Sequence, residues 1–217
     1  MSCVRIWEAW KKLKDKILAV LKLLLAILLV PFVIGITAAL WNALSLTAAP
    51  VPSAFGWGVV MYLVLHILLY QPSQVFDTGK KITETAIGFL APFFKVAGFC
   101  IPIFTILTFV VYAAALKIWP QVEEYFGCFV FVAAFALTMH LVMTANALKG
   151  KQAGWLKENY FFAIFAVYII NIMIVGAAFN LLTADFYFTD FMKSAGRKAG
   201  AIYTASFKQL FEVRDVR

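Results

Sequence analysis

The residues best placed to do chemistry in this sequence are two histidines, His66 and His140, because each lies inside a long apolar stretch. Where such a stretch crosses a membrane, its polar side chains are costly to bury and are functional candidates by default. Other polar residues recur on the same helical faces, and together they predict a polar seam inside a helix bundle. The predicted seam comprises Tyr62, His66, Thr105, Thr108, Tyr112, His140, Thr144 and Asn171.

Haem binding, zinc hydrolysis and serine proteolysis are the three kinds of membrane chemistry that these polar residues could support. Two imidazoles on facing helices could hold a haem, but hydrogen bonding between helices, worth about 0.6 kcal/mol per contact, is the reading we favour for His66 and His140. Zinc hydrolysis needs His-Glu-x-x-His, and neither histidine has a second one a helical turn away. A membrane serine protease would need a better-placed serine than Ser45 or Ser53. We therefore predict no catalytic residue, no metal and no cofactor.

The composition indicates the elements that must position these residues. Hydrophobic residues make up 64% of the chain and charged residues 14%, whereas a soluble domain is about 45–50% apolar. Four runs contain no charge, namely 23–76, 96–116, 125–148 and 159–184. These runs exclude a soluble enzyme, a disordered regulator and a disulfide-stapled domain. A transmembrane β-barrel is excluded too, because its strands alternate in polarity over about ten residues.

The sequence thus predicts an all-α fold, a polytopic transmembrane helix bundle of about five spans. A helix needs about 20 apolar residues to cross the hydrocarbon, so the first run must divide, and Pro50 and Pro52 mark the break. A bend is expected at Pro31. The transmembrane domain is predicted over 17–184, with an interfacial helix at 80–94 and spans at 17–43, 54–70, 96–119, 125–148 and 159–184.

Both ends of the chain are expected to be amphipathic. The pattern of residues 1–16 predicts an interfacial helix. Each of its positive charges near an anionic leaflet contributes on the order of 1 kcal/mol to membrane binding. Residues 185–217 predict a basic amphipathic tail, whose six scattered positive charges suit lipid headgroups better than nucleic acid. The expected membrane-surface contacts are Lys11, Lys12, Lys14 and Lys16.

Orientation follows from the lysines and arginines of the short connections. With the N-terminus in the cytoplasm, twelve of them lie inside, and only Lys117 lies in the outside loops. An odd number of spans then places the basic tail 185–217 outside, although lysines and arginines are normally in excess on the cytoplasmic side. An arrangement with both ends inside is therefore kept as an alternative. We expect an integral protein of a bacterial inner (cytoplasmic) membrane.

Several short motifs resemble those of bacterial membrane proteins distantly related to site-two-protease-type zinc metallopeptidases. The resemblance covers roughly 62–182. Its residues are Leu90-Ala91-Pro92-Phe93, Ile101-Pro102-Ile103-Phe104-Thr105, Leu137-Thr138-Met139-His140-Leu141, Thr144, Leu148, Gln152, Tyr160-Phe161-Phe162 and Tyr168-Ile169-Ile170-Asn171.

In those relatives a Gly-His-Glu-Leu-Thr-His-like motif precedes the Leu-Ala-Pro element. Here the corresponding region, 75–86, contains neither zinc-binding histidine, and the spacing of Glu84 does not register with the catalytic glutamate. The resemblance therefore implies a catalytically inactive member kept for binding or scaffolding.

Three hypotheses for function follow. The first is a non-enzymatic structural or accessory subunit of a larger membrane protein complex, whose partners are the lipid bilayer and other membrane subunits. The second is a carrier or channel component for a lipid or apolar substrate, which predicts a continuous cavity lined by seam residues. The third is the inactive metallopeptidase-like protein.

Overall fold

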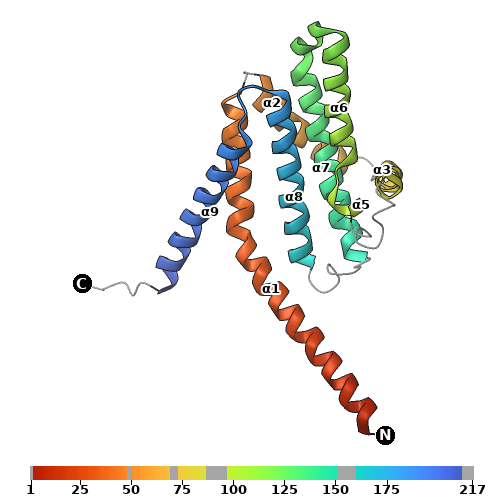
Figure 1. The fold of residues 1–217 in the computed structure, drawn as a ribbon, viewed down its shortest axis with the longest axis vertical. Helices are drawn as coiled ribbons and strands as arrows, with labels where there is room; N and C mark the ends of the chain where they lie inside the picture. The colour runs from red at the N-terminus through yellow and green to blue at the C-terminus, as the bar shows by residue number, and fades with distance from the viewer. Residues whose placement is uncertain (1, 48–49, 69–72, 87–96, 151–159, 212–217) are drawn as a thin grey trace, which may run out of the picture.

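The chain folds into a bundle of long α-helices (Figure 1). The computed structural model describes residues 2–47, 50–68, 73–86, 97–150 and 160–211, and within these ranges it contains no strand, which confirms the all-α prediction. The helices are α1 (Ser2–Ser45), α2 (Pro50–Leu68), α3 (Ser73–Ala86), α5 (Ala97–Cys100), α6 (Ile103–Ile118), α7 (Phe126–Gly150), α8 (Tyr160–Leu182) and α9 (Phe188–Phe211), with a 3₁₀ helix, η2 (Pro120–Tyr125), between α6 and α7.

Four helical segments are long and apolar enough to cross a membrane: Leu13–Ser45 of α1, α2, η2 with α7, and α8. The predicted spans at 54–70, 125–148 and 159–184 occupy nearly the ranges of α2, α7 and α8. The predicted span at 96–119 is not one helix. It is divided at Ile101 and Pro102 into α5 and the 16-residue α6, because proline cannot donate the hydrogen bond that would continue the helix.

The interfacial helix predicted over 80–94 differs from the observed element. Helix α3 begins earlier, at Ser73, and ends at Ala86, and the remainder of the predicted range lies outside the described residues. Gly79 allows α3 to approach α6, since a Cβ at this glycine would lie 3.0 Å from Ile103 Cγ2. The helix is therefore packed against the start of α6.

The long helices alternate in direction. Helices α2 and α7 run parallel, because Gly127 faces Pro50 and Ala54 near the start of α2, and Gly58 faces Ala134 further along. The tight packing at Gly58 brings the backbones close, as small residues do between membrane helices. Helices α6 and α8 run opposite to α7 (Figure 1).

Helix α1 differs from the sequence prediction at its start. Residues 1–16 were expected to form a separate interfacial helix, but α1 is continuous over its 44 residues from Ser2 to Ser45, with Pro31 inside it. Proline in a helix interior is a common cause of a kink. Figure 1 shows α1 changing direction between its two halves, so that its N-terminal half extends past the ends of α7 and α8.

The C-terminal region also differs from expectation. The sequence predicted a tail at 185–217 on the side opposite the N-terminus, whereas α9 turns back and runs antiparallel along α1 (Figure 1). Gly35 of α1 packs against Ala195 and Ala199, and the Tyr203 hydroxyl donates to the Leu28 carbonyl. Both described ends of the chain consequently lie at the same end of the bundle.

An aromatic cluster joins α9 to the rest of the bundle. Phe179 of α8 is fully buried, and its ring centroid lies 5.5 Å from that of Phe109 and 5.7 Å from that of Phe186. Phe186 in turn stacks near Phe191. Buried aromatic pairs of this kind contribute about 0.5–1.5 kcal/mol beyond their buried area. The start of α9 is therefore held in the hydrophobic core.

Candidate functional site

The most polar part of the interior surrounds the break between α5 and α6. In a continuous helix the Phe99 carbonyl would accept from the Ile103 N–H, but this N–H donates to the Ile101 carbonyl at 3.0 Å instead. The Cys100 carbonyl ends α5 and has no backbone N–H partner among the described residues. A buried backbone carbonyl without a donor costs free energy. Other elements must supply those donors.

Two seam residues supply them. His140 of α7 donates from Nε2 to the Phe99 carbonyl at 3.1 Å. Asn171 of α8 donates from Nδ2 to the Cys100 carbonyl at 3.1 Å and to the Val167 carbonyl at 2.8 Å. Both side chains are buried. The break is thus fastened to α7 and α8 by two of the three seam residues that the sequence predicted in those helices.

The other seam residues near this point act locally. Thr105 is buried and donates to the Ala133 carbonyl of α7 at 3.3 Å, whereas Thr108 donates to the carbonyl of its own helix at Phe104. Thr144 is fully buried. Within the described residues, neither its hydroxyl nor the Oδ1 atom of Asn171 has a hydrogen-bond partner. Tyr112 packs with aromatic residues of α7 instead.

The two seam residues of α2 interact with each other. The hydroxyl of Tyr62 lies 3.4 Å from Nδ1 of His66, and the two rings are stacked with centroids 5.6 Å apart. His66 and His140, the haem candidates, therefore each contact a protein group, and the described residues show no contact between the two imidazoles. This geometry favours hydrogen bonding, rather than haem binding, as the role of His66 and His140.

The main apolar cavity lies elsewhere. It has a volume of about 430 Å³ and lies among α1, α2, α7 and α8. On its wall, Thr37 Oγ1 and the hydroxyl of Tyr168 are 2.7 Å apart and joined by a hydrogen bond. None of the predicted seam residues lines it. The lining residues are Thr37, Leu40, Trp41, Leu44, Phe55, Val59, Leu137, Thr138, Leu141, Val142, Ala145, Ile164, Tyr168 and Ile172.

This apolar cavity could not be predicted from the sequence. Its walls come from four helices that are far apart in the chain, and almost all of its lining residues are ordinary apolar ones. Thr37 and Tyr168 are the signal that could have been noticed, because each places a hydroxyl within an otherwise apolar helix. Only the packing of α1 against α8 brings the two together.

The residues expected at the membrane surface lie on the projecting half of α1. Lys11, Lys14 and Lys16 are exposed, and the Lys12 side chain lies outside the described residues, as does that of Glu84. Among the side chains that the structure describes, no three His, Cys, Asp or Glu residues gather into a group able to hold a metal ion.

The all-α architecture and the four long apolar helices define an integral membrane protein of the helical-bundle class. No protein-family model, curated protein or solved structure matches this chain.

Proposed function

We propose that this protein is a non-enzymatic accessory subunit of a larger membrane complex and that it binds its partner through the N-terminal half of α1. The observation that carries the proposal is the projection of this half beyond the bundle (Figure 1). No other helix of the described chain runs beside the projecting end.

The length of α1 supports this placement. Its 44 residues extend over about 66 Å at 1.5 Å per residue, roughly twice the 30 Å thickness of the hydrocarbon. The uncharged stretch between Lys22 and Asn42 alone is long enough to cross. The residues before Lys22 therefore extend into or beyond the headgroup region.

This outer half carries an uncovered apolar stripe, which we call the α1 stripe and define as Trp7, Trp10, Leu13, Ile17 and Leu21. These residues recur every three or four positions, so they share one helical face. All five are exposed, Trp7 by 73% and Trp10 by 58%. An apolar stripe of this size outside the hydrocarbon is typical of a protein interface.

The charges beside the stripe indicate the chemistry of the partner. Lys14 lies on the same helical face as the α1 stripe and Lys11 borders it, whereas Glu8 and Asp15 lie toward the opposite face. A partner helix with its own apolar stripe and acidic flanking residues would pair with this surface, as helices do in coiled coils. Such a partner is a second membrane subunit with a helix extending from the same side of the bilayer.

The interior supports a structural role rather than catalysis. His140 and Asn171, two buried polar side chains beside the α5–α6 break, donate to backbone carbonyls of the chain itself. These donor groups hold three helices together. This use of the seam agrees with the accessory-subunit proposal.

Affinity purification in mild detergent tests the proposal. The wild-type protein should retain a stoichiometric membrane partner, and the double variant Trp10→Ser/Ile17→Ser should lose it. The matched control, Glu8→Ser/Asp15→Ser, changes the opposite face of the same turns and should retain it. Wild-type protein that elutes as an isolated monomer from native membranes, or equal retention by both double variants, would contradict the proposal.

A second candidate function, binding of a lipid or another apolar molecule, is favoured by the cavity of about 430 Å³. Pockets of this size and apolar character hold small apolar ligands. Filling it with Val142→Phe should abolish retention of a co-purified apolar molecule, detected by mass spectrometry of an organic extract. The same extract from wild-type and variant protein would argue against this candidate.

A further inference from the structure

A polar recess lies on the other side of α1, where its C-terminal end meets the first turns of α9. Two adjoining cavities, of about 270 and 380 Å³, form it. Asn42, Ser194 and Arg197 line both cavities. We call this region the α1–α9 recess. It is separate from the α1 stripe and from the apolar cavity of the bundle.

The recess contains two neighbouring cations. Lys198 is held in place by Asn42: with the Asn42 amide oriented so that its nitrogen donates to the Ala38 carbonyl at 3.3 Å, its oxygen accepts from Lys198 Nζ at 3.1 Å. Arg197 is exposed, and the described part of the chain supplies no carboxylate or carbonyl to its guanidinium. The Lys198 ammonium retains two further donors, and the Arg197 guanidinium retains all five.

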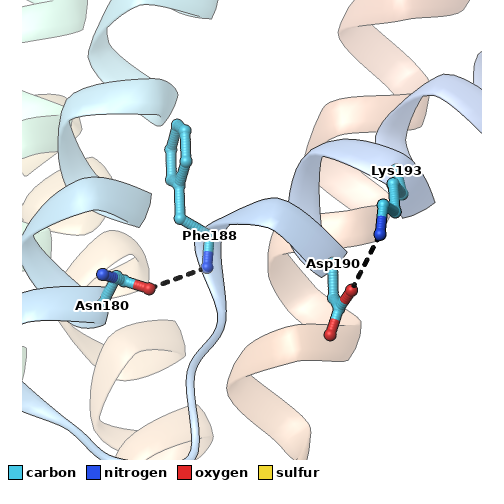
Figure 2. Close-up of polar contacts among 4 residues, drawn as sticks. All are labelled: Asn180, Phe188, Asp190 and Lys193. Carbon is cyan, nitrogen blue, oxygen red and sulfur yellow. Dashed lines mark hydrogen bonds and ion pairs between the residues drawn. The ribbon is translucent and has the colours of Figure 1, made fainter.

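Two acidic residues, Asp185 and Asp190, line one of the cavities, and among the described residues neither forms an ion pair with Arg197 or Lys198. The Asp190 carboxylate is instead 3.8 Å from Lys193 Nζ, an i,i+3 ion pair within α9. Figure 2 shows this pair beside the turn in which Asn180 Oδ1 accepts from the Phe188 N–H at 2.9 Å. The hydrogen bond fixes the start of α9, so the recess is a defined part of the fold.

The recess lies at the depth of lipid headgroups. Nineteen uncharged residues separate Lys22 from Asn42, and as a helix they span about 30 Å, the thickness of the hydrocarbon. Trp41, the residue before Asn42, is exposed, and tryptophan is enriched at the membrane–water interface. On the hydrocarbon side of Asn42, Ile34 is exposed as well, so acyl chains can pass along the outside of α1.

We propose that the α1–α9 recess binds the phosphodiester group of a phospholipid. The planar guanidinium of Arg197 matches two phosphate oxygens, and Lys198 contributes a charge whose aliphatic stem can follow the helix surface to the headgroup level. The Ser194 hydroxyl supplies a neutral donor. A phospholipid is the source because phosphate is the anion that the bilayer itself presents at this depth. The bound lipid would bridge the first and last helices of the chain.

The test uses native mass spectrometry of the full chain in detergent, with phosphatidylglycerol added as the probe. The wild-type protein should bind it, and Arg197→Gln should bind it roughly tenfold more weakly, since each charge-assisted hydrogen bond contributes about 1.5–3 kcal/mol. Because Arg197 has no partner in the described chain, its substitution should leave the melting temperature unchanged. Lys117→Gln, an exposed cation at the end of α6, is the matched control and should bind as the wild type does.

Four results would overturn the proposal. Equal binding of phosphatidylglycerol by the wild type and Arg197→Gln would show that the lipid does not bind at the recess. Equal affinity for diacylglycerol, which lacks the phosphate, would assign retention to the acyl chains alone. Equal affinity for free glycerol 3-phosphate would identify a soluble ligand instead. Loss of a protein partner from Arg197→Gln with lipid binding intact would show that the recess receives a partner's carboxylate.

Discussion

Helices α7 and α8 hold polar side chains inside the bundle, whereas α9 carries its charged side chains at the edge of the α1–α9 pair. In the bundle, His140 and Asn171 hydrogen-bond to carbonyls of an interrupted helix and are shielded on all sides. In the pair, Gly35, Ala195 and Ala199 form the contact, and the charges of α9 lie around it. The bundle therefore depends on satisfied polar groups, and the pair depends on the close fit of small residues.

The largest effect is expected where the bundle is packed most tightly. In Gly58→Ala the new Cβ would meet the Phe131 carbonyl oxygen and lie 2.9 Å from Ala134 Cβ. Backbone atoms cannot move aside easily, so overpacking should lower the free energy of unfolding by about 2 kcal/mol. Detergent-induced unfolding followed by circular dichroism measures this change. Gly196→Ala, where nothing lies within 4 Å, is the control and should be neutral or slightly stabilising.

A smaller effect is expected at the helix break. In His140→Leu the Phe99 carbonyl loses its side-chain donor, and an unsatisfied buried carbonyl should lower stability by about 1.5 kcal/mol. The neighbouring Cys100 should then react faster with a maleimide, in a background in which Cys3 and Cys128 are replaced by serine. His140→Gln restores a donor and should recover part of the loss. An unchanged labelling rate would show that the break needs no cap.

A still smaller and more local effect is expected for Gly35→Ala. Its Cβ would lie 2.8 Å from the Ala199 amide nitrogen and 2.9 Å from the Ala195 carbonyl oxygen, but two helices at the edge of the molecule can move apart. We expect the substitution to destabilise the packing of α9 against α1 by about 1 kcal/mol, without an effect on the other helices. Trypsin should cleave faster after Lys198, while the unfolding midpoint of the bundle stays the same. If faster cleavage after Lys198 is accompanied by an equivalent fall in the unfolding midpoint of the bundle, the α1–α9 pair and the bundle unfold together.

The smallest effect is expected for the ion pair of α9. The side chains of Lys193 and Asp190 are 75% and 71% exposed, and exposed pairs contribute about 0–1 kcal/mol. Lys193→Gln should change stability by less than about 0.5 kcal/mol at any salt concentration. A larger loss would show that the charges of the α1–α9 pair, and not its small residues, hold it together.

The sequence predicted the helices whose signal is local. Each of α2, α7 and α8 is a continuous apolar segment bounded by polar or proline-containing connections, so composition was sufficient to place it. The division at Pro102 was missed because apolar residues continue on both sides of it. Its partners, His140 and Asn171, were predicted as seam residues from their polarity within apolar segments. Their hydrogen bonds to the Phe99 and Cys100 carbonyls could not be predicted, because backbone carbonyls leave no mark in a sequence.

The docking of α9 could not be read from hydropathy. Its lysines and its arginine give it the composition of a surface helix, and the small residues that fit against Gly35 carry no charge or polarity to mark them. Ala195 and Ala199 are four residues apart, the small-residue spacing of closely packed helices, and this was the available signal. The return of α9 also bears on the basic tail: it favours an arrangement in which the two described ends of the chain lie on the same side of the membrane.

The pairing of α1 with α9 joins two helices that are far apart in the order of synthesis, since α1 ends at Ser45 and α9 ends at Phe211. At about 5–20 residues per second, the end of α9 is made roughly 8–33 s after the end of α1. During that interval Gly35 and its neighbours present an open surface within the membrane. A nascent chain that stops before α9 would keep this surface open, because it lacks the helix that closes it.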